Sequence, residues 1–109
     1  MVSSWVKATS ISPRVKEAVY ERDGGLCIFC GRRGLPEAHV VPRSRGGMGV
    51  EENIVTVCRQ CHDAMDGADR KKKLEIAKRY LRERYPGWDE KKLEYHKGGS
   101  YERPLDKDI

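Results

Sequence analysis

The stretch that decides the fold runs from Cys27 to His62 and reads CIFCGRRGLPEAHVVPRSRGGMGVEENIVTVCRQCH. It contains two pairs of cysteines, each separated by two residues: Cys27 with Cys30, and Cys58 with Cys61. Two residues between thiolates allow both sulfurs of a tight turn to bind one ion, and two such turns complete a tetrahedron around Zn²⁺. We therefore expect a structural zinc site with four cysteine ligands and no open coordination position.

Two other chemistries are open to these cysteines, namely disulfide bonds and a redox-active dithiol. The first residues of the chain lack the apolar run and the cleavage site of a secretory signal, which predicts a cytoplasmic protein. Disulfides are rare in the cytoplasm, so the metal site is favoured. No apolar run approaches the roughly 20 residues of a membrane helix, and we expect no membrane partner.

Composition and charge describe a short, polar chain. Its 109 residues are 38% hydrophobic and 36% charged. So few apolar residues form only a small hydrophobic core, and a small domain of this kind is often stabilised by a metal. The formal net charge is +5, made up of +1 in residues 1–26, zero in residues 27–67 and +4 in residues 68–109. The basic C-terminal third permits binding to a polyanion such as DNA; the alternative is a solvated helix face.

Helices are expected on both sides of two short strands. Ser12 as N-cap and Pro13 as first helical residue predict a helix that continues to about residue 22. Residues 37–41 and 54–57 are β-rich, and the glycine-rich residues 43–53 between them are expected to be flexible. A long helix is predicted over residues 68–85, with Leu74, Ala77 and Leu81 on its apolar face.

The C-terminal end of the chain is expected to form a short helix from an Asp89 N-cap to about residue 96. The predicted organisation is an N-terminal arm (residues 1–12), a core (13–67), a basic helical extension (68–97) and a mobile tail (98–109).

Three blocks of sequence between residues 19 and 66 resemble a known family. They are residues 20–31 (YERDGGLCIFCG), 38–47 (AHVVPRSRGG) and 52–62 (ENIVTVCRQCH). In this order they resemble the HNH endonucleases. The resemblance implies a small α+β fold: a ββα-metal (His-Me finger) core held by the four-cysteine zinc site and flanked by N-terminal and C-terminal helices. It also implies metal-dependent hydrolysis of phosphodiester bonds in DNA.

The resemblance assigns catalytic roles to His39, Asn53 and His62. His39 matches the general base that activates water, a task that suits an imidazole with a pKa near neutrality. Asn53 matches the central asparagine, whose amide orients the base or the loop that presents it. His62 matches a ligand of a catalytic divalent cation, for which Mg²⁺, Mn²⁺ and Ni²⁺ are the candidates.

One position departs from the family pattern. Most relatives carry a metal-binding Asp or His just before the base, where this chain has Ala38. Asp66, one helical turn beyond His62, is the first substitute ligand. Glu37 is the second, because strand alternation places it on the same face as His39. Asp63 is the third.

Several basic residues are candidates for contacts with the DNA backbone. Arg43, Ser44 and Arg45 carry donors that could bind phosphates, and Gly46 and Gly47 would let the backbone approach closely; the alternative is an ordinary flexible turn. Lys71, Lys72 and Lys73 lie at the start of the basic helix.

Residues 80–88 loosely resemble the end of small HNH proteins from bacteriophages, which suggests a phage protein in a bacterial host cell and a role beside the packaging terminase. The rival hypothesis is a catalytically inactive zinc module that binds DNA or a protein, and Ala38 is its main support.

Overall fold

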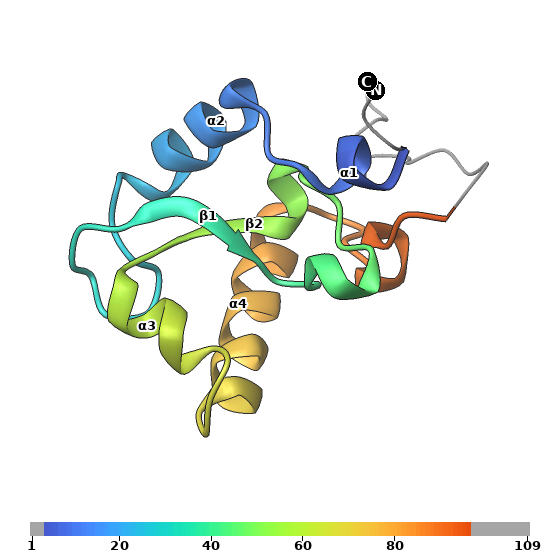
Figure 1. Cartoon of the computed structure of the whole chain (residues 1–109). Helices are drawn as coiled ribbons and strands as arrows, with labels where there is room; N and C mark the ends of the chain where they lie inside the picture. Colours follow the sequence, from blue (N-terminus) through green and yellow to red (C-terminus); the bar gives the residue numbers. More distant parts are fainter. Residues whose placement is uncertain (1–3, 97–109) are drawn as a thin grey trace.

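The computed structural model describes residues 4–96, and its centre is an antiparallel hairpin (Figure 1). Strand β1 (Leu35–His39) pairs with β2 (Ile54–Val57), and the register places Ala38 opposite Val55. Helix α3 (Arg59–Ala64) follows β2 almost directly. The chain therefore has the predicted small α+β, ββα-metal architecture.

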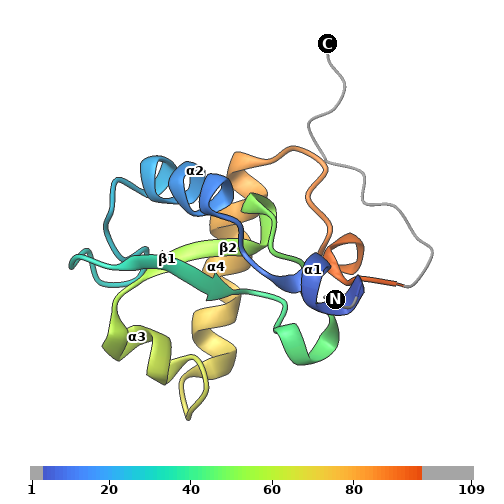
Figure 2. The same ribbon diagram turned by 45° about the horizontal axis from the view of Figure 1, so that its top comes forward.

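Two longer helices cover the hairpin from different sides (Figures 1 and 2). Helix α2 (Pro13–Asp23) precedes it, and α4 (Arg70–Arg84) follows α3. The predicted start of α2 is confirmed, because the Ser12 side chain accepts a hydrogen bond of 3.2 Å from the Val15 amide. The helix ends at Gly24, whose φ of 67° is accessible to glycine without strain.

The core lies between the hairpin and α4. Ala77 and Leu81 are fully buried and belong to one cluster with Ala38, Val55 and Val57. Leu74 packs at its edge, so the predicted apolar face of α4 is confirmed. Burial of a side chain such as Leu81 contributes about 2 kcal/mol, which explains why so polar a helix is held in place.

Two predicted boundaries were wrong. Strand β1 begins at Leu35 and ends at His39, not over residues 37–41, and its register shifts between Leu35 and Ala38. Pro36 lies in this interval and has no amide proton to pair. The final helix is only a 3₁₀ turn, Glu90–Leu93, although Asp89 caps it as predicted by accepting a hydrogen bond from the Lys91 amide. The tail predicted for residues 98–109 lies outside the described residues.

The expectation of a flexible segment over residues 43–53 was also wrong. The segment forms two 3₁₀ turns, Arg43–Arg45 and Glu51–Asn53, and residues 46–49 are buried. A Cβ on Gly47 would lie 1.6 Å from the Val41 carbonyl oxygen. Gly47 is therefore required by the protein's own packing.

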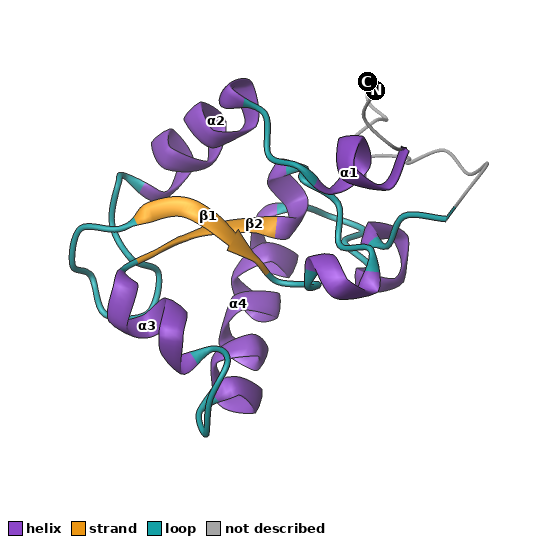
Figure 3. Cartoon of the chain, viewed as in Figure 1, coloured by secondary structure: helices purple, strands orange, loops and turns teal. Residues whose placement is uncertain are grey.

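The N-terminal arm contains a helix that the sequence did not predict, α1 (Ser4–Thr9), shown with the other helices in purple in Figure 3. It packs beside the loop that follows β1, and the Gly49 amide donates a hydrogen bond of 3.0 Å to the Ala8 carbonyl. In the part of the chain that the structure describes, no helix is long and apolar enough to cross a membrane.

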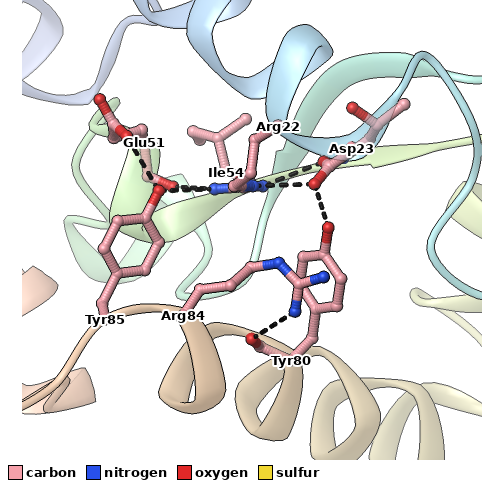
Figure 4. Close-up of polar contacts among 8 residues, drawn as sticks. Arg22, Asp23, Glu51, Ile54, Tyr80, Arg84 and Tyr85 are labelled. Carbon is pink, nitrogen blue, oxygen red and sulfur yellow. Dashed lines mark hydrogen bonds and ion pairs between the residues drawn. The ribbon is translucent and has the colours of Figure 1, made fainter.

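A buried polar network joins the end of α2 to β2 and α4 (Figure 4). Arg22 forms an ion pair with Asp23, with 2.8 Å between Nε and Oδ1, and donates to the Glu51 and Ile54 carbonyls. Asp23 also accepts hydrogen bonds from the Thr56 amide and the Tyr80 hydroxyl.

The pKa values of this pair reflect mutual stabilisation. Burial alone would raise the pKa of Asp23, but the hydrogen bonds from Arg22 and Tyr80 and the Arg22 charge hold it below its usual value. Burial would lower the pKa of Arg22, and Asp23 holds it above its usual range. Arg22 also donates a hydrogen bond of 3.2 Å to the Tyr85 hydroxyl. We refer to Arg22, Asp23, Tyr80 and Tyr85 as the Arg22 network.

Candidate functional site

The four cysteines meet where the loop after α2 approaches the start of α3. Their sulfur atoms all lie within 4.8 Å of one another, and none forms a disulfide. The Cys30 and Cys58 sulfurs are 3.6 Å apart. Tetrahedral Zn²⁺ with bonds of about 2.3 Å requires sulfur separations of about 3.8 Å. The spacing and the soft donor set therefore fit zinc, as the sequence predicted.

The thiols also show why this cluster suits a cation. Burial acts to raise the pKa of Cys27, but backbone amides of Cys58, Cys30 and Phe29 point at its sulfur and lower the pKa to about 7. Burial and the neighbouring sulfurs raise the pKa of Cys61 to about 12. Four negative sulfurs at this spacing repel one another, so full deprotonation requires a bound cation.

A separate open cavity of about 490 Å³ brings together most of the predicted catalytic residues. Its lining comes from the segment before α2, from α2, β1 and the turn after it, and from α3 and the turn beyond. The lining residues are Ser10, Ile11, Lys16, Glu37, Ala38, His39, Pro42, Arg43, His62, Met65 and Asp66. We call this space the β1–α3 cavity.

His39 lies at the end of β1 and is half-buried at the cavity wall. Its Nε2 is 2.9 Å from the Thr9 carbonyl oxygen. Because a carbonyl only accepts, Nε2 carries the proton in the neutral ring, and Nδ1 is left as the acceptor. Burial lowers the pKa of His39, aided by the charges of Arg43 and His62 and opposed by the Thr9 bond. The ring is therefore neutral, and able to accept a proton, at neutral pH.

Asn53 does not line the cavity. It is fully buried, and its Oδ1 accepts a hydrogen bond of 2.8 Å from the Val41 amide. Its Nδ2 donates to the carbonyls of Val41 and Met48. The amide thus closes the loop between residues 41 and 48, which leads directly out of β1 and carries Arg43.

The predicted cation ligands lie around the cavity but are not preassembled. His62 and Asp66 both line it and are exposed. Helix α3 ends at Ala64, so Asp66 lies in the turn beyond the helix and not one helical turn after His62, as was expected. Within residues 4–96, the cysteines form the only group of three or more possible ligands whose atoms lie within 4.8 Å.

The other two candidate ligands differ in position. Glu37 lines the cavity, with its carboxylate 3.5 Å from the Lys16 ammonium. Asp63 is exposed and is not part of the cavity lining. Ala38 contributes no ligand atom and is 1% exposed, packed in the hydrophobic core.

A model of the HNH endonuclease family matches residues 27–74. This part of the chain is therefore similar to the HNH endonucleases, as its sequence blocks indicated. The matched residues include all four cysteines as well as His39, Asn53, His62 and Asp66. Comparison with curated proteins gives no matching sequence.

The basic residues predicted to contact DNA point to different places in the structure. Arg43 lines the cavity and donates to the Thr9 hydroxyl. Arg45 instead forms an ion pair of 2.6 Å with Glu94, and Ser44 is exposed outside the cavity lining.

The lysines at the start of α4 also differ among themselves. Lys71 and Lys72 are exposed, whereas the Lys73 ammonium lies 4.7 Å from the centre of the Phe29 ring. Part of the Lys73 charge is therefore engaged by the protein itself.

Sequence reasoning missed two residues of the candidate site. Thr9 belongs to the arm that was placed outside the core, yet its carbonyl contacts the His39 ring. Lys16 contributes a positive charge to the cavity from α2. Neither residue lies within the family match. For Thr9 the sequence offers no sign of a role in the site. For Lys16 the one sign is its position in the helix predicted from residue 13.

Proposed function

We propose that the protein is a divalent-metal-dependent endonuclease that hydrolyses phosphodiester bonds of duplex DNA with little sequence readout. The observation that carries this proposal is the β1–α3 cavity, in which a neutral histidine with a free Nδ1 faces the same space as His62, Asp66 and Arg43. A base, ligand atoms for a cation and a donor for phosphate are the groups that phosphodiester hydrolysis requires.

His39 acts as the general base. Its Nδ1 accepts a proton from the attacking water while Nε2–H keeps its hydrogen bond to the Thr9 carbonyl. The positive charge that forms on the ring is then shared with this carbonyl, which stabilises the imidazolium. Burial of the ring keeps it unprotonated before the reaction.

A divalent cation would be held by His62 and Asp66, and Glu37 would be a further ligand if its carboxylate left Lys16. When bound, the cation neutralises charge on the phosphate and on the leaving oxygen. One imidazole and one or two carboxylates form a mixed donor set that accepts Mg²⁺, Mn²⁺ or Ni²⁺. Both residues are exposed at the cavity, so ion and phosphate can reach them from solvent.

Binding to DNA rests on the phosphate backbone. Arg43 supplies a guanidinium inside the cavity, and Lys16 a second positive charge at its wall. Lys71 and Lys72 are exposed on α4 and extend the contact. Such contacts position the protein on DNA but carry no base information, which supports low sequence specificity.

The experiment that tests this proposal is conversion of supercoiled plasmid to nicked circle. Wild type and His39→Ala are compared with EDTA and with Mg²⁺, Mn²⁺ or Ni²⁺. We expect metal-dependent nicking that falls by about 10²- to 10⁴-fold in His39→Ala, as for loss of a general base. His96→Ala is the matched control, because His96 is exposed and lies outside the cavity.

The alternative is a catalytically inactive zinc module that binds DNA or a protein partner, and Ala38 supports it by offering no ligand atom. It predicts that wild type does not nick DNA with any of the three metals, whether or not it binds DNA. A role in phage genome packaging beside a terminase stays a prediction from the resemblance of residues 80–88.

A further inference from the structure

We propose that the N-terminal arm is part of the active site and that Thr9 is its positioning residue, orienting both His39 and Arg43. The catalytic consequence of this inference rests on the proposed nuclease function, but the positioning itself does not. The arm precedes the residues that match the family model, and the sequence predicts it to lie outside the core.

Thr9 contacts both residues with different groups. Its carbonyl oxygen lies 2.9 Å from His39 Nε2. Its hydroxyl oxygen accepts from Arg43 Nε at 3.2 Å and from Nη2 at 3.1 Å, while donating to the Trp5 carbonyl at 2.9 Å. Thr9 itself is completely buried. A fully buried threonine thus connects the candidate base to the one loop arginine that lines the cavity.

The arm is held in this position by the loop after β1. A Cβ on Gly49 would lie 2.0 Å from the Ser10 carbonyl oxygen, so the two backbones are in direct contact. The Trp5 ring of α1 also meets the Tyr95 ring edge to face, with 6.4 Å between the ring centres. Because backbone contacts on this loop and a ring contact both fix α1, the Thr9 carbonyl has a defined place.

The effect on the reaction follows from geometry. The bond to the Thr9 carbonyl fixes both the Nε2–H tautomer and the plane of the His39 ring, so that Nδ1 points in one direction. The hydroxyl fixes the Arg43 guanidinium through two of its nitrogens. Loss of such orientation by about 1 Å can cost up to about 100-fold in rate.

The first test removes the hydroxyl alone. Thr9→Val keeps the volume and the carbonyl, and Thr56→Val is the matched control, because Thr56 is also fully buried but its hydroxyl has no hydrogen-bond partner among the described residues. We expect a shift of the Arg43 Nε–H signal in NMR spectra, and nicking reduced by about tenfold, in Thr9→Val only. Thr9→Ser, which keeps the hydroxyl, restores both.

The second test displaces the carbonyl in the full chain. Gly49→Ala places a methyl group against Ser10, which moves the arm away from His39. In wild type, the hydrogen bond to Thr9 should make the Nε2–H signal of His39 visible. We expect this signal to disappear in Gly49→Ala, whereas zinc content and the circular dichroism spectrum remain.

Three outcomes would overturn the inference. They are an unchanged Arg43 signal in Thr9→Val, equal losses in Thr9→Val and Thr56→Val, and a protected Nε2–H in Gly49→Ala. If wild type does not nick DNA at all, the proposed function fails, but the two NMR signals still decide whether Thr9 positions these side chains.

Discussion

The Arg22 network and the β1–α3 cavity use the same kinds of side chains in opposite ways. In the network, Arg22 donates to Asp23, to two backbone carbonyls and to the Tyr85 hydroxyl. The Asp23 side chain is completely buried between its donors. In the cavity, His62 and Asp66 are exposed, and within residues 4–96 their side chains make no hydrogen bond or ion pair.

The charges of the Arg22 network therefore stabilise the fold, whereas those of the β1–α3 cavity are available to a ligand. A buried ion pair with complete hydrogen bonding contributes to one unique arrangement, and loss of one partner leaves a buried charge. Exposed ligand atoms cost little to keep in water and are free to bind. His39 lies between these cases, because Nε2 has a partner and Nδ1 has none among the described residues.

Removal of zinc should have the largest effect and should affect both regions together. Cys58 caps the start of α3, which carries His62, and directly follows β2, whose backbone contacts the network. We expect the chain to lose its cooperative thermal unfolding, measured by circular dichroism, after chelation or in Cys58→Ser. Readdition of Zn²⁺ should restore the transition in wild type only; a folded, metal-free protein would contradict the assignment of the site.

Asp23→Asn should lower the stability of the fold far more than a substitution in the cavity does. It leaves the Arg22 charge buried without its counter-ion, and we expect a loss of about 3–5 kcal/mol in the free energy of unfolding measured with urea. His39→Ala, in the cavity, should change the same quantity by no more than about 1 kcal/mol. Equal losses of unfolding free energy in the two variants would contradict the distinction between a stabilising network and a cavity available to ligands.

The pH dependence of stability provides the control for Asp23. Its pKa is lower in the folded than in the unfolded chain, so its contribution is fully present above its ordinary value of 3.8 and is lost as pH falls through the lower, folded pKa. Wild type should therefore lose stability in this acid range. This part of the pH dependence should be absent from urea titrations of Asp23→Asn.

Neutralisation of the α4 lysines should give the smallest effect, which concerns DNA binding alone. Replacing Lys71, Lys72 and Lys73 by Gln should lower the slope of log affinity against log salt by about 2 to 3, measured by fluorescence anisotropy. Stability should remain, because two of the three side chains are exposed. The double variant Lys91→Gln, Lys92→Gln is the matched control on another exposed segment. An equal decrease of the salt slope in this control would show that α4 has no special role in DNA binding.

Short-range sequence patterns predicted most of the framework. The two cysteine pairs predicted the zinc site, Ser12 and Pro13 predicted the start of α2, and the spacing of Leu74, Ala77 and Leu81 predicted the buried face of α4. Each of these depends on ligand spacing, a cap or a helical period, which are local properties of the chain. The three sequence blocks likewise indicated the family that the comparison found.

The candidate site was predicted in its residue types but not in its arrangement. His39, His62, Asp66 and Arg43 do share one cavity, but Arg45 turns to Glu94, and Asn53 binds the loop from inside the core. Adjacent residues in a tight turn point in different directions, and no local pattern states which of them faces the cavity.

By itself, the sequence determined the four-cysteine cluster, the ββα order and the similarity to the HNH endonucleases, because these follow from spacings of a few residues. Only the tertiary structure decided that α1 returns to place Thr9 against His39, and that Asp23 meets Tyr80 on a distant helix. Such contacts join residues about 30 to 60 positions apart. They depend on how whole helices and strands pack against one another. The number of hydrogen bonds that a side chain can form does not specify this packing.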